Sequence, residues 1–434
     1  MMPPLLLLQS QMAVSVSLPP LVPCVAAARH GRMGLCVSSN GTEIPIVLRG
    51  ANYIRLDSHE HFHSTFSPSD YNRTKFSIAM RELSNKGFNV VRVFVDHRTT
   101  TGIAGLPGQS TPLDRAYCSR LAQFVSDAAG YGLYTIVTLQ SLPANAFFRN
   151  ATRHMAKPSW NAQFLMDIGH SAWTTYSDAL SATLASMLTG PTGIGEVASS
   201  GGGDSVLFSL QNELFLRGDE WPFNASAGLA DTAAGAFDMA VPSERQRAAD
   251  ENTNRWADGC RGAVRKHLPR ALVTAGVFTF EAVGKDGPDG LQAHDCNHTH
   301  DCRFPARPYW LSRSTLDWLD VHVYVPNALK LVHSLMSEEW SRVHASKPIV
   351  MGEFGCLGGL VGKGNRRWYA TAAACAPHVA GVQKASCVAG FVGWLFWTYD
   401  TDDLAEQPQW FSMVDDHRAI ETALAPANRT DPCS

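Results

Sequence analysis

The sequence predicts an α/β fold, a (β/α)8 TIM barrel that forms a single domain with extended loops. Eight short apolar runs have the composition of buried strands, and stretches with the spacing of amphipathic helices separate them. Apolar strands that alternate with helices are typical of a parallel sheet covered by helices. Eight such units favour a closed barrel over an open sheet, and the glycine-rich dinucleotide fingerprint of many open sheets is absent.

The predicted elements follow one another along residues 40–425, which we expect to form the barrel. The strands are predicted at residues 46–53, 88–95, 133–140, 205–212, 271–278, 318–324, 347–354 and 391–398. Apolar residues recur every three or four positions in the helices, predicted at residues 75–86, 115–131, 171–188, 244–267, 331–344 and 366–378. Residues 193–204 and 283–308 form the two long loops.

Composition and charge narrow the class of partner. The chain has 434 residues and a formal net charge of -3, and its isoelectric point is near 6.6. Because there is no basic excess, we expect neither nucleic acid nor an anionic membrane surface as a partner. A neutral ligand fits this charge better, and 11 tryptophans, 10 tyrosines and 20 phenylalanines can supply flat apolar faces for sugar rings. We expect a monomer.

The first 28 residues have features of a signal or leader segment. They contain no Lys, Arg, Asp or Glu, carry a run of four leucines at residues 5–8, and end in three alanines. Prolines interrupt this segment, so it does not have the pattern of a membrane span. Glycosylation motifs are more frequent than chance would produce, at Asn40, Asn72, Asn150, Asn224, Asn297 and Asn428. The sequence therefore predicts a secreted, extracellular glycoprotein.

Ten cysteines fit an oxidising compartment. One of them, Cys24, lies in the predicted leader, so that nine remain and one is expected to stay unpaired. Short loops predict one disulfide between Cys296 and Cys302 and another between Cys375 and Cys387.

Two of the apolar runs end in a glutamate. Glu213 closes the run Phe-Ser-Leu-Gln-Asn-Glu, and Glu353 follows Pro-Ile-Val-Met-Gly. In a barrel, the carboxyl ends of the strands and the loops after them build the site, so both carboxylates are expected at the same end. Two carboxyl groups allow one acid and one nucleophile, which is the requirement for cleaving a glycoside. A glutamate at a strand end is more commonly a salt-bridge partner, but the pairing with Asn212 favours a site.

Other strand ends add polar and aromatic residues to the same region. Arg92 is a charge inside a buried strand, which is costly unless a carboxylate pairs with it. Tyr324 and Arg92 are placed to keep Glu353 ionised, and Gly352 lets the backbone approach closely. An acid and a nucleophile need opposite protonation, so we expect a raised pKa for Glu213 and a low one for Glu353. Trp397 and His322 also have simpler explanations, as a core aromatic and a buried imidazole.

The order of these residues on the strands resembles glycoside hydrolase family 5, a family of retaining clan A barrels. By this resemblance Glu213 is the acid/base and Glu353 the nucleophile, while Asn212 binds the sugar 2-hydroxyl. Trp397 is then the platform under the sugar beside the scissile bond. The resemblance further implies substrate-binding or supporting roles for Arg92, His322, Tyr324 and Asn52.

Details of the sequence are similar to the β-mannanase branch of that family. Arg-Gly-Ala-Asn52-Tyr and Leu-Phe-Trp397 are similar to that branch, which commonly lacks the histidine that many cellulases have where this chain has Gln140. Leu214 replaces a proline found in many members.

The resemblance implies a secreted retaining β-glycoside hydrolase that cleaves β-linked polysaccharide or oligosaccharide by double displacement. The expected type is an endo-β-mannanase or an endo-β-glucanase, with glycolipid also open, and no cofactor or metal is required. The alternatives are a catalytically altered carbohydrate-binding barrel and a transglycosylase on the same fold.

Two segments contain the residue types of a metal site. Residues 59–63, His-Glu-His-Phe-His, match a zinc-protease pattern, but that pattern needs a helix and this segment follows the first strand as a loop. Residues 294–302 contain three histidines and two cysteines, and there we expect an exposed disulfide loop instead.

Overall fold

The computed structural model describes residues 18–26, 32–55, 63–106, 111–151, 159–189, 202–285, 291, 301–324, 338–356, 369–399 and 410–434. At its centre lies a parallel sheet with the strand order β11-β7-β6-β5-β4-β16-β15-β14-β12. β11 (Val273–Thr274) pairs with β7, and β12 (Gly276–Phe278) pairs with β14. These two strands are pieces of one segment interrupted at Ala275, so the sheet closes on itself. The predicted (β/α)8 barrel is confirmed.

Each of the other predicted strands also forms part of the barrel wall. They are β4 (Leu48–Asn52), β5 (Val90–Phe94), β6 (Tyr134–Thr138), β7 (Val206–Ser209), β14 (Leu319–Val323), β15 (Ile349–Gly355) and β16 (Gly393–Trp397). Along β5, Val91 and Val93 face outward to the helices, whereas Val90 and Phe94 face the barrel interior. Arg92 therefore points inward as well.

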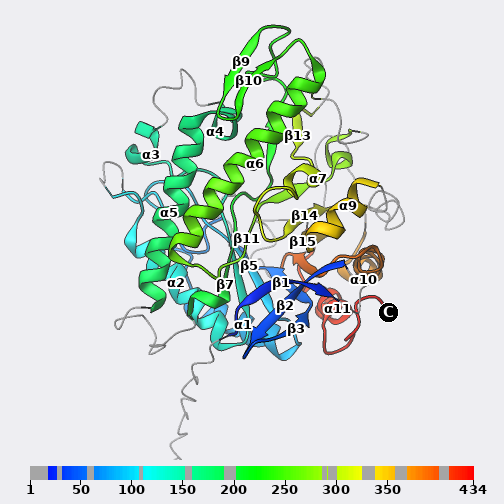
Figure 1. Cartoon of the computed structure of the whole chain (residues 1–434). Coiled ribbons are helices and arrows are strands. Elements are labelled where there is room, and N and C mark those ends of the chain that lie inside the picture. Colours follow the sequence, from blue (N-terminus) through cyan, green and yellow to red (C-terminus); the bar gives the residue numbers. More distant parts are fainter. Residues whose placement is uncertain are drawn as a thin grey trace, which may run out of the picture.

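Helices surround the barrel (Figure 1). The main ones are α1 (Arg73–Asn85), α2 (Arg115–Gly130), α5 (Asp167–Thr189), α6 (Pro242–His267), α9 (Glu338–Ser346), α10 (Ala372–Ala389) and α11 (Asp415–Leu424). Shorter helices are α3 (Ala146–Ala151), α4 (Ala162–Leu165), α7 (Pro308–Leu311), η2 (Gly202–Ser205) and η3 (Phe280–Val283). Asn72, Asp114 and Thr371 cap the first turns of α1, α2 and α10 with their side chains.

Two predicted helices differ from the structure at their limits. Of the helix predicted at residues 331–344, residues 331–337 lie outside the described part, and α9 (Glu338–Ser346) continues past the predicted end. The helix predicted at residues 366–378 was too short, because α10 continues to Ala389. It ends there because Gly390 has a φ of 110°, a left-handed conformation that stops the helix.

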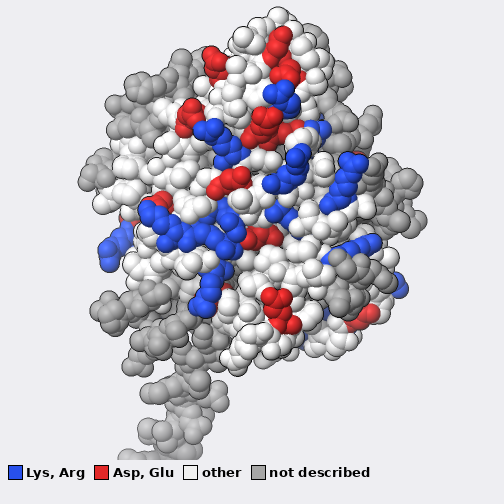
Figure 2. Space-filling model, viewed as in Figure 1, with Lys and Arg blue, Asp and Glu red and all other residues white. Residues whose placement is uncertain are grey.

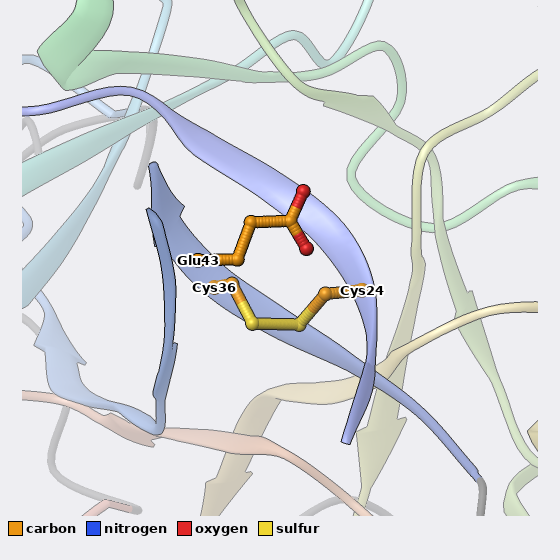
Figure 3. Close-up of side chains that lie close together, drawn as sticks. All are labelled: Cys24, Cys36 and Glu43. Carbon is orange, nitrogen blue, oxygen red and sulfur yellow. A yellow bond between two sulfur atoms is a disulfide. The ribbon is translucent and has the colours of Figure 1, made fainter. Parts of the chain in front are cut away.

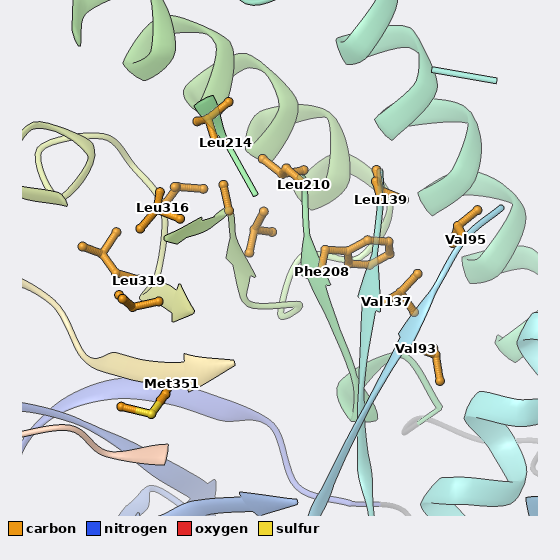
Figure 4. Packing of buried hydrophobic residues seen from close by; sticks show 14 of the residues in the cluster. Val93, Val95, Val137, Leu139, Phe208, Leu210, Leu214, Leu316, Leu319 and Met351 are labelled. Carbon is orange, nitrogen blue, oxygen red and sulfur yellow. The ribbon is translucent and has the colours of Figure 1, made fainter. Parts of the chain in front are cut away.

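Apolar residues pack on both sides of the barrel wall. The larger cluster lies between the strands and the helices, and Figure 4 shows part of it, from Val93 and Val137 to Leu319 and Met351. A smaller cluster fills the interior at the amino ends of the strands and includes Leu48, Val90, Ile136, Leu207, Val350 and Leu395. The interior at the carboxyl ends holds polar side chains beside a third small apolar cluster of Ile54, Phe94 and Trp397.

A small antiparallel sheet covers the amino ends of the strands. Its order is β1 (Leu21–Ala26), β2 (Arg32–Ser39) and β3 (Thr42–Ile46). Leu21 and Leu35 join the interior cluster, and a disulfide links Cys24 to Cys36 beside Glu43 (Figure 3). Of the predicted leader, residues 1–17 lie outside the described part, whereas residues 21–26 form β1.

The other disulfides correct the predicted pairing. Cys375 pairs with Cys356, and Cys387 pairs with Cys433. The prediction of a Cys375–Cys387 bridge was wrong because both residues lie on α10. Twelve helical residues span about 18 Å, whereas a disulfide needs Cα atoms closer than about 7 Å. Cys296, the predicted partner of Cys302, lies outside the described residues.

The loops at the carboxyl ends contain two further strand pairs. β8 (Phe215–Arg217) pairs with β13 (Arg303–Pro305), and β9 (Leu229–Thr232) pairs with β10 (Gly235–Asp238), a hairpin at the top of Figure 1. On the face in Figure 2 basic side chains lie among acidic ones. Arg261 and Arg265 both form ion pairs with Asp317. Among the described helices, none is long and apolar enough to cross a membrane.

Candidate active site

The residues predicted from strand ends meet inside the barrel, at the carboxyl ends of the strands. Inward positions alternate along each strand, so a side chain two residues beyond a core position reaches the site. On β5 this places Arg92 two residues after Val90. The side chains that hydrogen bonds and ion pairs join here are those of Asn52, Arg92, Asn212, Glu213, Asp320, His322, Tyr324 and Glu353.

Glu353 reaches the interior because β15 carries an extra residue. The register of β15 shifts against both neighbours: Val350 pairs with Asp320, but Glu353 pairs with His322. Against β16 the shift lies between Met351 and Phe354. Strict alternation from the inward Val350 would turn Glu353 outward to the helices. The bulge turns it into the barrel instead.

Two donors hold the Glu353 carboxylate. Arg92 Nη1 donates to Oε1 at 2.7 Å, and the Tyr324 hydroxyl donates to Oε2 at 2.8 Å. Glu353 is buried, with 4% of its surface exposed. Burial raises the pKa of this carboxyl, and the charges of His322 and Arg92 act against that rise. Both oxygens accept hydrogen bonds, which favours the ionised form.

Glu213 follows β7, and its carboxylate and that of Glu353 approach the same ring nitrogen of His322. His322 Nδ1 lies 3.0 Å from Glu213 Oε1 and 3.5 Å from Glu353 Oε2. One carboxylate oxygen of each glutamate and a ring nitrogen of His322 all lie within 4.8 Å of one another. The Glu213 side chain is 28% exposed, far more than that of Glu353 at 5%. Glu213 is therefore the more accessible of the two carboxyl groups.

The two glutamates have pKa shifts opposite to those predicted. Burial disfavours the charged form of Glu213, but the hydrogen bond and charge of His322 outweigh burial and lower the pKa of this carboxyl. The pKa of Glu353 is raised because this side chain is enclosed more deeply. The prediction neglected the charge of His322 beside Glu213 and the burial of Glu353.

Arg92 lies at the centre of the cluster with no exposed surface. Besides Glu353, its guanidinium donates to Asn52 Oδ1 at 3.0 Å and to Asn212 Oδ1 at 2.9 Å. Asn52 is equally buried and donates to the Gly352 carbonyl at 2.9 Å. Because protein groups hold its amide, we expect Asn52 to position Arg92 and not to contact sugar.

Sequence reasoning missed Asp320, a buried carboxylate on β14. It lies 3.5 Å from Arg92 Nη2 and 3.6 Å from His322 Nε2, and is 1% exposed. A Cβ atom on Gly352 would lie 1.8 Å from Asp320 Oδ1, so only glycine admits this carboxylate beside β15. Alternation offered a signal: Asp320, His322 and Tyr324 are two residues apart, on the same face of β14.

His322 is held in its charged form. Burial alone would lower its pKa, but Glu353, Asp320 and Glu213 outweigh burial and raise it to about 10. Two cations, Arg92 and His322, thus face three carboxyl groups.

The His322 shift predicts how stability depends on pH. A pKa raised above the unfolded value of about 6.5 stabilises the fold fully below that pH. This contribution disappears as the pH rises through about 10. We expect the free energy of unfolding of wild type, minus that of His322→Asn, to shrink by a few kcal/mol between about pH 6 and pH 10. Urea unfolding across this range measures the difference, and a constant value would contradict a charged His322.

Aromatic rings form one wall of the site. Trp397, 8% exposed, packs on Phe94 with ring centroids 5.5 Å apart. Tyr324 lies against Trp410 at 4.7 Å. Trp394, in contrast, is a core residue that faces away from the site and donates to Ser386 Oγ.

The opposite wall, beside Glu213, is formed by the β8–β13 pair. The Arg303 guanidinium lies 5.7 Å from the Phe215 ring centroid and 5.1 Å from that of Phe278. It also contributes to lowering the pKa of Glu213. The sequence placed Arg303 in a long loop and offered no sign of this role.

The two segments with metal-site residue types fall mainly outside the described residues. Of residues 59–63 only His63 is described, and of residues 294–302 only the last two. Among described residues, Glu213, His322 and Glu353 form one of the clusters with metal-ligand types, and the two others contain disulfide cysteines.

Sequence comparison finds no relative: no family model matches the chain, and no similar sequence was found among curated proteins. Solved structures are similar. The endo-1,4-β-mannanase from Rhizomucor miehei aligns over 92% of this chain and 98% of its own, with a TM-score of 0.55 and 12% identity.

Two further structures are similar to the same extent. A glycoside hydrolase family 5 mannosidase from Rhizomucor miehei covers 94% of this chain and 98% of its own, with a TM-score of 0.51 and 12% identity. An exo-β-1,4-mannosidase from an Opitutaceae bacterium covers 97% of this chain, with a TM-score of 0.52 and 17% identity. This chain spans 62% of that mannosidase. At such identities the likeness concerns the fold, and the chain therefore has the barrel fold found in family 5 mannanases and mannosidases.

Proposed function

We propose that the protein is a retaining β-glycoside hydrolase of glycoside hydrolase family 5 that cleaves β-linked polysaccharide or oligosaccharide. The observation that carries this proposal is the spacing of the two glutamates, with carboxylate oxygens within 4.8 Å of each other beside one ring nitrogen of His322. Retaining enzymes hold their carboxyl groups about 5–5.5 Å apart, whereas inverting enzymes need about 6.5–9.5 Å to admit a water.

The geometry supports a different role for each glutamate. Glu353 is enclosed, and Arg92 and Tyr324 orient both of its oxygens, as a nucleophile requires. Glu213 is the more exposed of the two, as a group that exchanges a proton with the leaving oxygen and with water requires.

The reaction then proceeds by double displacement. Glu353 bonds to the anomeric carbon while the bond from that carbon to the leaving oxygen breaks, and Glu213 transfers its proton to that oxygen. In the second step Glu213 takes a proton from water, the water oxygen bonds to the anomeric carbon, and the Glu353 carboxylate is released. In this proposal Asn212 binds the sugar 2-hydroxyl and Trp397 lies under the ring.

The substrate we propose first is a β-1,4-linked mannan, with β-glucan second and glycolipid third. Support comes from the names of the similar structures, which are mannanases and mannosidases. Aromatic side chains on both walls of the site also suit a sugar chain.

A polysaccharide panel tests the function. Purified protein is incubated with β-mannan, β-glucan and short oligosaccharides, reducing ends are measured, and proton NMR follows the anomer formed first. We expect release from one class with retained β configuration. Inverted product would contradict the mechanism. Binding without release would favour the carbohydrate-binding alternative, and products longer than the substrate would indicate transglycosylation.

Secretion is part of the proposal, and β1 limits where a leader is removed. Cleavage after residue 28 would remove β1 and leave Cys36 without Cys24. We therefore expect the mature chain to begin before Leu21. N-terminal sequencing of protein secreted by a eukaryotic host measures this, and a mature terminus at residue 29 would contradict it.

A further inference from the structure

His63 stands beside the predicted sugar platform without a role in the proposed chemistry. Its ring stacks on Phe94, with centroids 4.1 Å apart and planes 10° apart. The Trp397 ring lies 5.9 Å away and nearly perpendicular, at 84°. The imidazole of His63 and the indole of Trp397 are thus nearly perpendicular neighbours, beside the cluster that holds both glutamates.

The polar atoms of His63 have no partner among the described residues. Nδ1 is enclosed and makes no hydrogen bond, while Nε2 is not enclosed and makes none either. His63 is 9% exposed, and a buried polar side chain without partners is costly to keep unless it serves a ligand. No cluster of metal-ligand residues found among the described residues includes His63.

The imidazole is also uncharged. Burial, followed by the charge of Arg92, lowers the pKa of His63 to about 3. A neutral imidazole both donates and accepts hydrogen bonds, as a sugar hydroxyl does. It is therefore suited to bind a hydroxyl, and unsuited to the proton transfers assigned to Glu213.

We propose that His63 is a specificity-determining residue whose Nε2 hydrogen-bonds a ring hydroxyl of the sugar that lies on Trp397. This inference rests on the proposed function and names the part of the substrate that His63 recognises. One face of the sugar ring packs on Trp397. The His63 imidazole, which is nearly perpendicular to the indole, then contacts the hydroxyl groups at the edge of the sugar ring. A sugar lacking the contacted hydroxyl leaves Nε2 unpaired and is discriminated against.

The test uses aryl β-glycosides of the sugar class identified by the panel, each lacking one ring hydroxyl. His63→Phe keeps a flat ring on Phe94 but removes both nitrogens. We expect kcat/KM for the parent glycoside to fall about 3- to 10-fold, the worth of one neutral hydrogen bond. Wild type should lose a similar factor with one deoxy substrate, and the variant should lose nothing further with that substrate. The pH profile should not change.

Two further variants make the result decisive. His344→Phe is the matched control, because His344 is also buried, has a lowered pKa and lies against Phe391, away from the site; its deoxy pattern should match wild type. His63→Gln restores a polar nitrogen and should retain discrimination at the same hydroxyl even if His63→Phe does not fold.

The role of His63 would be overturned if wild type and His63→Phe discriminated equally against the deoxy substrates. It would also be overturned if His63→Gln lost the same factor in kcat/KM with every deoxy substrate. Either result would leave the proposed hydrolase activity intact. If wild type cleaves no glycoside, the proposed function fails and the role of His63 falls with it.

Discussion

Glu353→Gln is expected to abolish turnover of every β-glycoside, with a loss in kcat of roughly 10⁴-fold or more. The amide accepts hydrogen bonds in place of the carboxylate but does not form the bond to the anomeric carbon. Binding should persist, because the substitution changes one buried group and leaves both aromatic walls in place. Kinetics with an aryl glycoside and calorimetric binding of an oligosaccharide measure the two effects separately.

The counterpart Glu213→Gln should behave differently, because a good leaving group needs no proton. With a dinitrophenyl glycoside we expect a fast first turnover followed by a slow release, since no base then activates water. A fluorinated glycoside should label Glu353 in wild type, detected by mass. The control is Glu43→Gln, an exposed glutamate on β3 at the opposite end of the barrel, which should act like wild type. Substantial activity in Glu353→Gln would end the assignment of the nucleophile.

Arg92→Met is expected to destabilise the fold as well as inactivate the site. The guanidinium has no exposed surface and contacts Glu353, Asp320 and Asn212. Methionine fills much of the volume but leaves buried carboxylates without their main cation, which costs about 3–5 kcal/mol in the free energy of unfolding. Chemical denaturation measures this cost, and kcat/KM should fall in parallel because Glu353 loses the donor at Oε1.

The matched comparison is Arg73→Met. Arg73 forms an ion pair with Asp127 through two hydrogen bonds, but the Arg73 side chain is 58% exposed. An exposed pair contributes about 0–1 kcal/mol, so this variant should unfold nearly as wild type does. Equal destabilisation by both substitutions would show that burial of the Arg92 cluster carries no special energetic weight.

The sequence predicted much of the candidate site because strand ends leave local signals. Arg92 was found from its charge within a buried strand, and the structure pairs it with Glu353 as that cost requires. Trp394 and Trp397 look alike in sequence, and only alternation around β16 separates the core residue from the site residue.

Other features depend on neighbours far away in the chain. Glu353 points inward because of a bulge whose register is set against β14 and β16 together. The pKa directions of both glutamates reversed, because burial raises the pKa of Glu353 and the cationic His322 beside Glu213 lowers the pKa of that carboxyl. The predicted partner of Cys375 was wrong because residues close in sequence are not necessarily close in space. Cys375 and Cys387 both lie on α10, which holds them too far apart to form a disulfide.

By itself, then, the sequence determined the eight strands, the end of the barrel where polar residues gather, and two glutamates in that group. These follow from periodicity and from the cost of burying charge, which act within a few residues. Only the tertiary structure decided the partners: Asp320 beneath Arg92 and His322, Asn52 held by protein groups, and His63 against Phe94. The physical reason is that closing the sheet brings strands from all parts of the chain around one small volume. Charge and hydrogen bonding in that volume depend on distances that no stretch of sequence contains.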